Sequence, residues 1–188
     1  MEKVGKADCG RGAQDFTSAI PACDGLYTNE KNVPLGLNYA DCTPLLFYDP
    51  VTSSIAVAHG GWRGTAGNIA GEAVRHLQES YGAEPKNIKA GIGPAIGKSV
   101  FEVEKDVVEA FEKIFDEEEM KRLSAPKGEG KILIDLPLAN RMLMERAGIL
   151  PENIEDCGIC TYCRNDLFYS YRKTAGRTGR HMAVMMLK

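Results

Sequence analysis

The sequence predicts a mixed α+β fold in one domain over residues 1–188, with more strands than helices. Short apolar runs bounded by glycine or proline predict the strands, because strands are short and end at turn residues. Apolar residues at helical spacing predict the helices between them. No linker, repeat or low-complexity tract divides the chain, and its 188 residues are enough for one hydrophobic core.

Predicted strands dominate the first part of the chain. The first thirty residues lack helical periodicity, which indicates loops with short strands. Two apolar runs, residues 45–49 and 54–58, are separated by Asp49-Pro50 and predict a β-hairpin. Further strands are expected at residues 24–29, 34–39, 87–91, 131–135, 154–157 and 181–187.

Three segments have the spacing of amphipathic helices. The first begins at Thr65 and is expected to end near Gly82. Its apolar stripe consists of Ile69, Ala70, Ala73, Val74 and Leu77. The second helix is expected over residues 103–115, followed by a charged loop up to Gly130, and the third over residues 138–147.

Composition narrows the classes of function. The chain is 44% hydrophobic and 26% charged with a net charge of −3, which gives no electrostatic reason to expect nucleic acid or a membrane surface as partner. No apolar run has the length of a membrane span, and the N-terminus lacks the hydrophobic region of a signal peptide, so a cytoplasmic location is expected. Six cysteines in such a compartment indicate buried thiols, metal ligands or nucleophiles.

Cys42 and His59 flank the predicted hairpin. Cys42 precedes its first strand and His59 follows its second, so both side chains are expected at the same end of the hairpin. A thiolate and an imidazole together suit zinc, and three protein ligands with an open position form a catalytic zinc site. The alternative is that Cys42 is a core thiol and His59 a structural turn residue.

Two glycine-rich stretches follow strands. Gly60 and Gly61 precede Trp62-Arg63-Gly64, where glycines permit positive φ angles and close backbone approach, and where a helix N-terminus attracts anions. Arg63 adds a bidentate donor for phosphate or carboxylate. The second stretch, residues 91–97, contains Pro94 and lacks a parallel βαβ frame, so it indicates a pocket wall or a turn and not a dinucleotide site.

The C-terminal region carries three further candidates. Cys157, Cys160 and Cys163 form a CxxCxxC pattern, which lacks the fourth ligand of a usual zinc or iron–sulfur site. The segment 164–172 combines aromatic and basic residues that suit a planar base and a phosphate, or else a half-buried strand. His181 is a possible further ligand, although a lone histidine is more often structural.

Four motifs occur together in a fixed order. They are ADC at residues 40–42, AHGGWRG at 58–64, GPAIG at 93–97 with FEV at 101–103, and CRNDLFYSYR at 163–172 with TGR at 178–180. By these motifs the sequence resembles the YfiH-type family of purine nucleoside phosphorylases, formerly labelled multicopper polyphenol oxidases or laccase-domain proteins. The resemblance covers nearly the whole chain.

The resemblance implies an α/β/β/α sandwich of mixed sheets flanked by helices, and a zinc ion held by His, Cys and His. It also implies phosphorolysis of adenosine, inosine and methylthioadenosine, together with adenosine deamination. Cys42 and His59 match two of the three zinc ligands. The third is a histidine in an upstream Gln-x-His segment, but no histidine precedes His59 here. The sequence is therefore expected to lack an N-terminal portion, which leaves the zinc site incomplete.

The expected catalytic residues are Cys42, His59 and Arg63, with Arg63 and Arg172 binding phosphate beside the nucleoside. Three alternatives remain. One is a copper-dependent oxidase of phenols, which three histidines in the whole chain disfavour. A second is a hydrolase with Cys42 as nucleophile and His59 as base. A third is a binding module that keeps the pocket without the chemistry.

Overall fold

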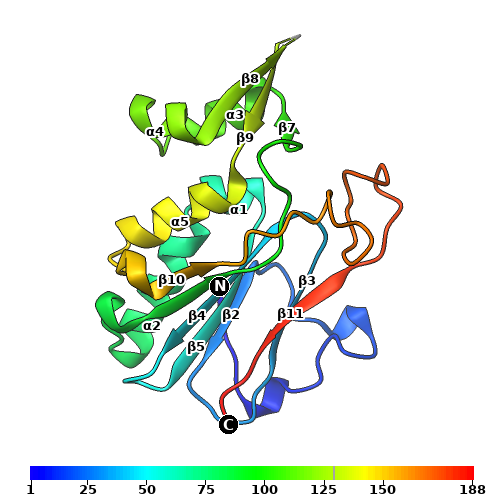
Figure 1. The fold of residues 1–188 in the computed structure, drawn as a ribbon. Coiled ribbons are helices and arrows are strands. Elements are labelled where there is room, and N and C mark those ends of the chain that lie inside the picture. Colours follow the sequence, from blue (N-terminus) through cyan, green and yellow to red (C-terminus); the bar gives the residue numbers. More distant parts are fainter. Residues whose placement is uncertain (129) are drawn as a thin grey trace.

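The central sheet of the protein has six strands in mixed orientation (Figure 1). The computed structural model describes residues 1–128 and 130–188. Two outer pairs, β1 with β2 and β6 with β10, are parallel, and the remaining neighbours are antiparallel. In spatial order the strands are β1 (Glu2–Lys3), β2 (Gly25–Thr28), β5 (Ser54–Gly60), β4 (Thr43–Asp49), β6 (Lys89–Ile92) and β10 (Ile154–Asp156).

Strands β4 and β5 form the hairpin that the sequence predicts. Their register runs from Asp49 opposite Ser54 to Thr43 opposite Gly60, so both strands extend beyond the predicted apolar runs. The Asp49 carboxylate holds the turn by accepting hydrogen bonds from the backbone N–H of Val51 at 3.0 Å and from the Thr52 hydroxyl at 2.7 Å. Such a side-chain bond two residues ahead is the Asx-turn, which explains why Asp49-Pro50 marks the turn.

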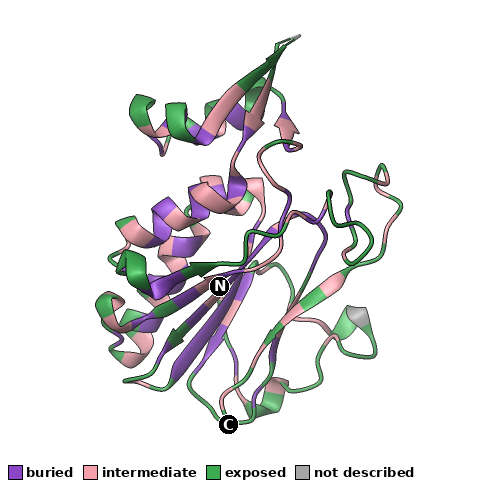
Figure 2. Cartoon of the chain, in the orientation of Figure 1, coloured by how far each residue is buried: buried purple, intermediate pink, exposed green. Residues whose placement is uncertain are grey.

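Helices cover one face of the central sheet and a second sheet covers the other. Ala56 and Ala58 of β5 pack into the core with the helices, whereas Ile55 and Val57 face the opposite side. The helices are α1 (Trp62–Ala66), α2 (Ile69–Tyr81) and α5 (Leu136–Arg146), and the second sheet pairs β3 (Leu35–Tyr39) with β11 (His181–Met185). Because both faces of β5 are covered, its residues from Ser54 to Ala58 are all buried (Figure 2). The predicted α+β class, with mixed sheets flanked by helices, is confirmed.

The first predicted helix is two helices. A break at Gly67-Asn68 separates α1 from α2, because Asn68 adopts a left-handed conformation with φ of 57°. Its side chain accepts a hydrogen bond from the backbone N–H of Gly71 and so caps the start of α2. The predicted end is right: Gly82 has a φ of 72° and closes α2.

A small three-stranded sheet with two helices forms the upper part of Figure 1. It contains β7 (Glu102–Val103), α3 (Lys105–Phe111), α4 (Glu117–Leu123), β8 (Ser124–Gly128) and β9 (Lys131–Ile134). Two predictions fail here. Val103 lies in a strand and not in the helix, and the segment predicted as a charged loop contains α4 and β8.

Helix α4 is stable despite its charge. Asp116 and Glu119 form a reciprocal capping box, with the Glu119 N–H donating to Asp116 at 2.9 Å and the Asp116 N–H donating to Glu119 at 2.8 Å. Acidic residues fill the first turn and Lys121 and Arg122 the last, which matches the helix dipole. Of its residues only Met120 and Leu123 are buried, so the helix has too short an apolar stripe to be predicted from hydrophobic periodicity.

Within the described ranges, no helix combines the length and the apolar character that crossing a bilayer requires.

Candidate active site

Cys42 and His59 face one small space at the open end of the β4–β5 hairpin. Cys42 lies just before β4, and His59 is paired with Pro44 within β5. A Cβ atom on Gly61 would lie 3.2 Å from Cys42 Sγ and 3.6 Å from His59 Nε2. The thiol and the imidazole therefore flank the space that the missing Gly61 side chain leaves open. The hairpin thus brings the two predicted metal donors together.

The glycines near this site let the backbone pass close to neighbouring atoms, and they do not adopt positive φ angles. Gly60, Gly61 and Gly64 are absent from the residues with positive φ, so that part of the prediction is wrong. A Cβ on Gly64 would lie 2.7 Å from the His59 carbonyl oxygen, closer than such atoms approach. Glycine therefore lets α1 start directly against the end of β5. Since α1 has only five residues, its dipole is weak and anion binding here rests on Arg63.

Burial keeps both members of the Cys42–His59 pair uncharged at neutral pH. Loss of solvent raises the pKa of the Cys42 thiol to about 11, and the nearby carboxylates of Asp41 and Asp24 act in the same direction, against Arg180. Burial lowers the pKa of His59, with Asp24 opposing the shift. A nucleophilic cysteine needs a lowered pKa, so this environment disfavours the Cys-His hydrolase.

Two protein donors are present in the candidate zinc site. Thiol sulfur and imidazole nitrogen are donors that zinc prefers, and both side chains face the space beside Gly61. Among the described residues, no group of three His, Cys, Asp or Glu side chains gathers in a way that could hold a metal. Within the part of the chain that the structure describes, the CxxCxxC cysteines form no such group either.

His181 lies among aromatic rings in the second sheet. It opens β11 opposite Tyr39, and its ring stands edge-on to the Tyr39 ring with 4.1 Å between centroids. Phe168 makes a second edge-on contact at 5.5 Å. Both ring nitrogens of His181 are buried and have no hydrogen-bond partner within the described part of the chain. Burial lowers the pKa of His181, although Asp41 opposes the shift, so the ring is neutral at pH 7.

Asp41 holds the C-terminal loop against the hairpin. Its side chain is buried and accepts three hydrogen bonds: from the Thr161 hydroxyl at 2.7 Å, the Ser170 hydroxyl at 3.0 Å and the Arg172 backbone N–H at 2.7 Å. Its φ of 79° is unusual for a residue other than glycine. In the sequence, Asp41 stands out only as part of the ADC motif, and its structural role depends on residues far along the chain.

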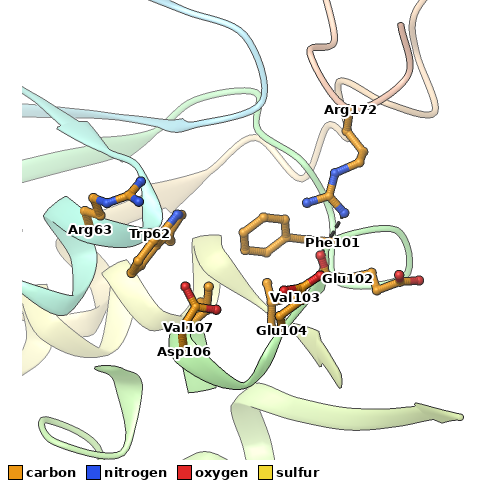
Figure 3. Close-up of a pocket in the computed structure, with 9 residues that line it drawn as sticks. All are labelled: Trp62, Arg63, Phe101, Glu102, Val103, Glu104, Asp106, Val107 and Arg172. Carbon is orange, nitrogen blue, oxygen red and sulfur yellow. Dashed lines mark hydrogen bonds between the residues drawn. The ribbon is translucent and has the colours of Figure 1, made fainter. Parts of the chain in front are cut away.

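Arg63 and Arg172 line the same pocket, which has a volume of about 520 Å³ (Figure 3). The Arg63 guanidinium stacks over the Trp62 ring at 4.1 Å and has no hydrogen bond or ion pair among the described residues. Arg172 lies over the Phe101 ring at 5.4 Å and donates from Nη1 to the Glu102 carbonyl oxygen at 2.8 Å. Arg63 therefore has more free donors for an anion than Arg172 has.

Carboxylates line the same pocket and partly offset the arginines. Glu102 makes ion pairs with Lys127 at 2.7 Å and Lys131 at 2.5 Å, which hold its pKa down at about 2. Figure 3 shows the Glu102 side chain turned away from the two arginines. The remaining acidic side chains of the lining belong to Glu104 and Asp106. Cys42 and His59 are not in the lining; the turn from His59 through Trp62 connects them to it.

The sequence and the structure of the chain were compared with those of known proteins, and both show its family. The family model described as multi-copper polyphenol oxidoreductase laccase matches residues 2–188. The chain belongs to this family. The structure of the hypothetical protein YfiH from Bacillus licheniformis superposes on the chain with a TM-score of 0.96 and 39% sequence identity. That match covers 100% of this chain and 70% of YfiH.

Relatives in this family are named for purine chemistry. The Bacillus subtilis protein named purine nucleoside phosphorylase YlmD is 39% identical over 188 residues, which is 100% of this chain and 67% of YlmD. A protein named adenosine deaminase RL5, from an unknown prokaryotic organism, is 36% identical over 163 residues, or 87% of this chain and 62% of RL5. The resemblance inferred from the four motifs is confirmed. The chain spans about two thirds of the length of these relatives.

Proposed function

We propose that the protein is a zinc-dependent purine nucleoside phosphorylase that cleaves adenosine, inosine and methylthioadenosine, with adenosine deamination as a second activity. The observation that carries the proposal is the pocket shared by Arg63 and Arg172, reached by one turn from the Cys42–His59 pair. The printed names of the relatives support the same chemistry. We also propose that the enzyme acts in the cytoplasm, in keeping with its composition.

In the proposed reaction, an oxygen of inorganic phosphate attacks the anomeric carbon of the ribose. The bond from that carbon to the purine nitrogen breaks, and the released base takes up a proton, leaving ribose 1-phosphate. Arg63 holds the phosphate, because its guanidinium donors are free and bind oxyanions in a bidentate manner. Arg172, which lies over the Phe101 ring in the same pocket, contributes a second positive charge. The aromatic faces of Trp62 and Phe101 suit a flat purine ring.

Zinc is the proposed cofactor, with Cys42 and His59 as two of its ligands. The donor chemistry suits zinc and both side chains face the space at Gly61, although no third His, Cys, Asp or Glu joins them among the described residues. When bound, zinc supplies Lewis acidity beside the purine and the ribose. Copper is disfavoured as the metal of an oxidase. A multicopper centre needs many imidazole ligands, whereas the three histidines of the chain lie on three different elements, β5, α2 and β11.

The direct test is an assay of the zinc-supplied protein with adenosine and phosphate. Chromatography should detect adenine, with inosine and hypoxanthine from deamination, and ribose 1-phosphate should equal the sum of adenine and hypoxanthine. Omitting phosphate should abolish adenine, hypoxanthine and ribose 1-phosphate and leave inosine formation. If the protein binds adenosine but forms no product with zinc present, the proposed enzymatic activity is contradicted and a binding module is favoured.

Replacing Arg63 by alanine is expected to raise the KM for phosphate by roughly 10–100-fold, since a charge-assisted bidentate contact contributes about 1.4–2.8 kcal/mol. Arg172→Ala should have a smaller effect, because one of its donors is already bonded to the Glu102 carbonyl. Initial rates at varied phosphate give both values. Arg164→Ala is the matched control, because Arg164 is exposed and pairs with Asp166 outside the pocket. An unchanged KM for phosphate in R63A would show that Arg63 does not bind the phosphate.

Replacing Cys42 by serine is expected to weaken zinc binding by more than about 100-fold, since even losing a residue that only supports a ligand costs 10–100-fold. Metal analysis after dialysis against a weak chelator measures the retained zinc. Cys157→Ser is the control, because Cys157 is exposed and lies outside the pair. Equal zinc retention in C42S and C157S would contradict ligation by Cys42.

A further inference from the structure

Cys160 and Cys163 are two free cysteines that the proposed function does not use. Cys160 is half-buried and Cys163 is exposed, at the start of the C-terminal loop. The Arg164 backbone N–H donates to the Cys160 carbonyl oxygen at 2.9 Å, which closes a helix-like turn over these residues. In such a turn, side chains three positions apart lie on the same side. The turn therefore holds the two thiols next to each other.

The sulfur of Cys160 is surrounded by hydrogen-bond donors. It accepts from the backbone N–H of Gly97 at 3.2 Å and from that of Cys163 at 3.4 Å. The Cys163 thiol also donates to it. The Gly97 donor comes from the loop after β6, which is fixed to this segment through the bridge between Ala95 and Cys160. Donors of this kind stabilise a thiolate, because they favour the charged form of the sulfur.

The acidity of the two thiols follows from these contacts. Burial alone would raise the pKa of Cys160, but the N–H groups of Cys163, Gly97 and Tyr162 and the Cys163 thiol together lower it below its ordinary value. The pKa of Cys163 is raised, chiefly because it donates a hydrogen bond to Cys160. Cys160 thus has the character of an attacking thiol, and Cys163 that of a resolving thiol.

We propose that Cys160 and Cys163 are a redox-active dithiol that exchanges with low-molecular-weight disulfides. The Cys160 thiolate attacks one sulfur of the small disulfide, so that a mixed disulfide forms and one small thiol leaves with a proton. The Cys163 thiol then loses its proton and attacks the Cys160 sulfur, which releases the second small thiol. Two protein thiols are oxidised to one disulfide, and the small disulfide is reduced to two thiols.

Glutathione disulfide is a suitable probe for the full 188-residue protein. After incubation with the reduced native protein at pH 7, peptide mass spectrometry should find the Cys160–Cys163 disulfide before any disulfide of Cys23 or Cys157. Cys163→Ser should stop at the mixed disulfide on Cys160. Cys157→Ser should still form the Cys160–Cys163 disulfide. If the pair stays reduced while Cys157 or Cys23 reacts, or if C163S carries no glutathione on Cys160, the proposal is overturned.

Alkylation provides an independent measurement. In native C163S at pH 7, iodoacetamide should modify Cys160 faster than Cys157, since a thiol held at a lower pKa has more of the reactive thiolate. Cys157 is the more exposed of the two, so access alone would give the opposite order. Faster alkylation of Cys157 would contradict a stabilised thiolate at Cys160. Circular dichroism confirms that C163S is folded before either experiment.

Discussion

Replacing Asp41 by alanine is expected to lower the free energy of unfolding by about 3–5 kcal/mol, because each buried polar group left without a partner costs about 1–3 kcal/mol. The substitution removes the common acceptor of the Thr161 and Ser170 hydroxyls and of the Arg172 backbone N–H. Alanine also tolerates the positive φ at this position less well than aspartate does. The C-terminal loop should therefore detach from the hairpin before the rest of the chain unfolds.

Urea unfolding followed by the fluorescence of Trp62 measures this effect, since Trp62 is the one tryptophan of the chain. Asp166→Ala is the matched control. Asp166 lies in the same loop but is exposed and pairs with Arg164 at the surface, so its loss should change stability by less than about 0.5 kcal/mol. Asp41→Asn should fall between the two, because the amide keeps one acceptor oxygen and presents a donor where a second acceptor is needed. Equal stability of D41A and D166A would show that the carboxylate does not hold the loop.

The local features of the site were predictable from sequence because they depend on neighbouring residues. The Asp49-Pro50 turn and the apolar runs on either side fix the hairpin, and the hairpin alone brings Cys42 and His59 to one end. Gly82 ends α2 because a left-handed residue is needed there. In each case the residues that determine the feature lie close to it in the sequence.

The long-range features were not predictable from spacing. The partners of Asp41 lie 120, 129 and 131 positions further along the chain, so no local pattern reveals them. Arg63 and Arg172 were each proposed for phosphate, but their common pocket arises from the way β7 and the C-terminal loop meet α1. Helix α4 was missed for a different reason: its capping box and charge order stabilise it with little apolar surface.

The affinity for zinc is expected to rise about tenfold for each pH unit between pH 7 and 8.5. In the proposed site zinc would bind the Cys42 thiolate, and a pKa raised to about 11 keeps this thiol protonated over that range. Binding must therefore release one proton from Cys42. The pKa of His59 is lowered, so its ring is already neutral there and releases none. The slope of log affinity against pH should thus be close to one.

Competition with a chromophoric chelator of known pH dependence measures this slope. His59→Gln should weaken binding and keep the slope, because Cys42 still supplies the proton. Cys42→Ser should lose both the affinity and the slope, since no thiol is left to ionise. A wild-type affinity that is constant over this range would mean that Cys42 either is already ionised or does not bind the metal. Iodoacetamide distinguishes these two cases: an ionised Cys42 in the zinc-free protein would be alkylated rapidly at pH 7, and a protonated, buried one would not.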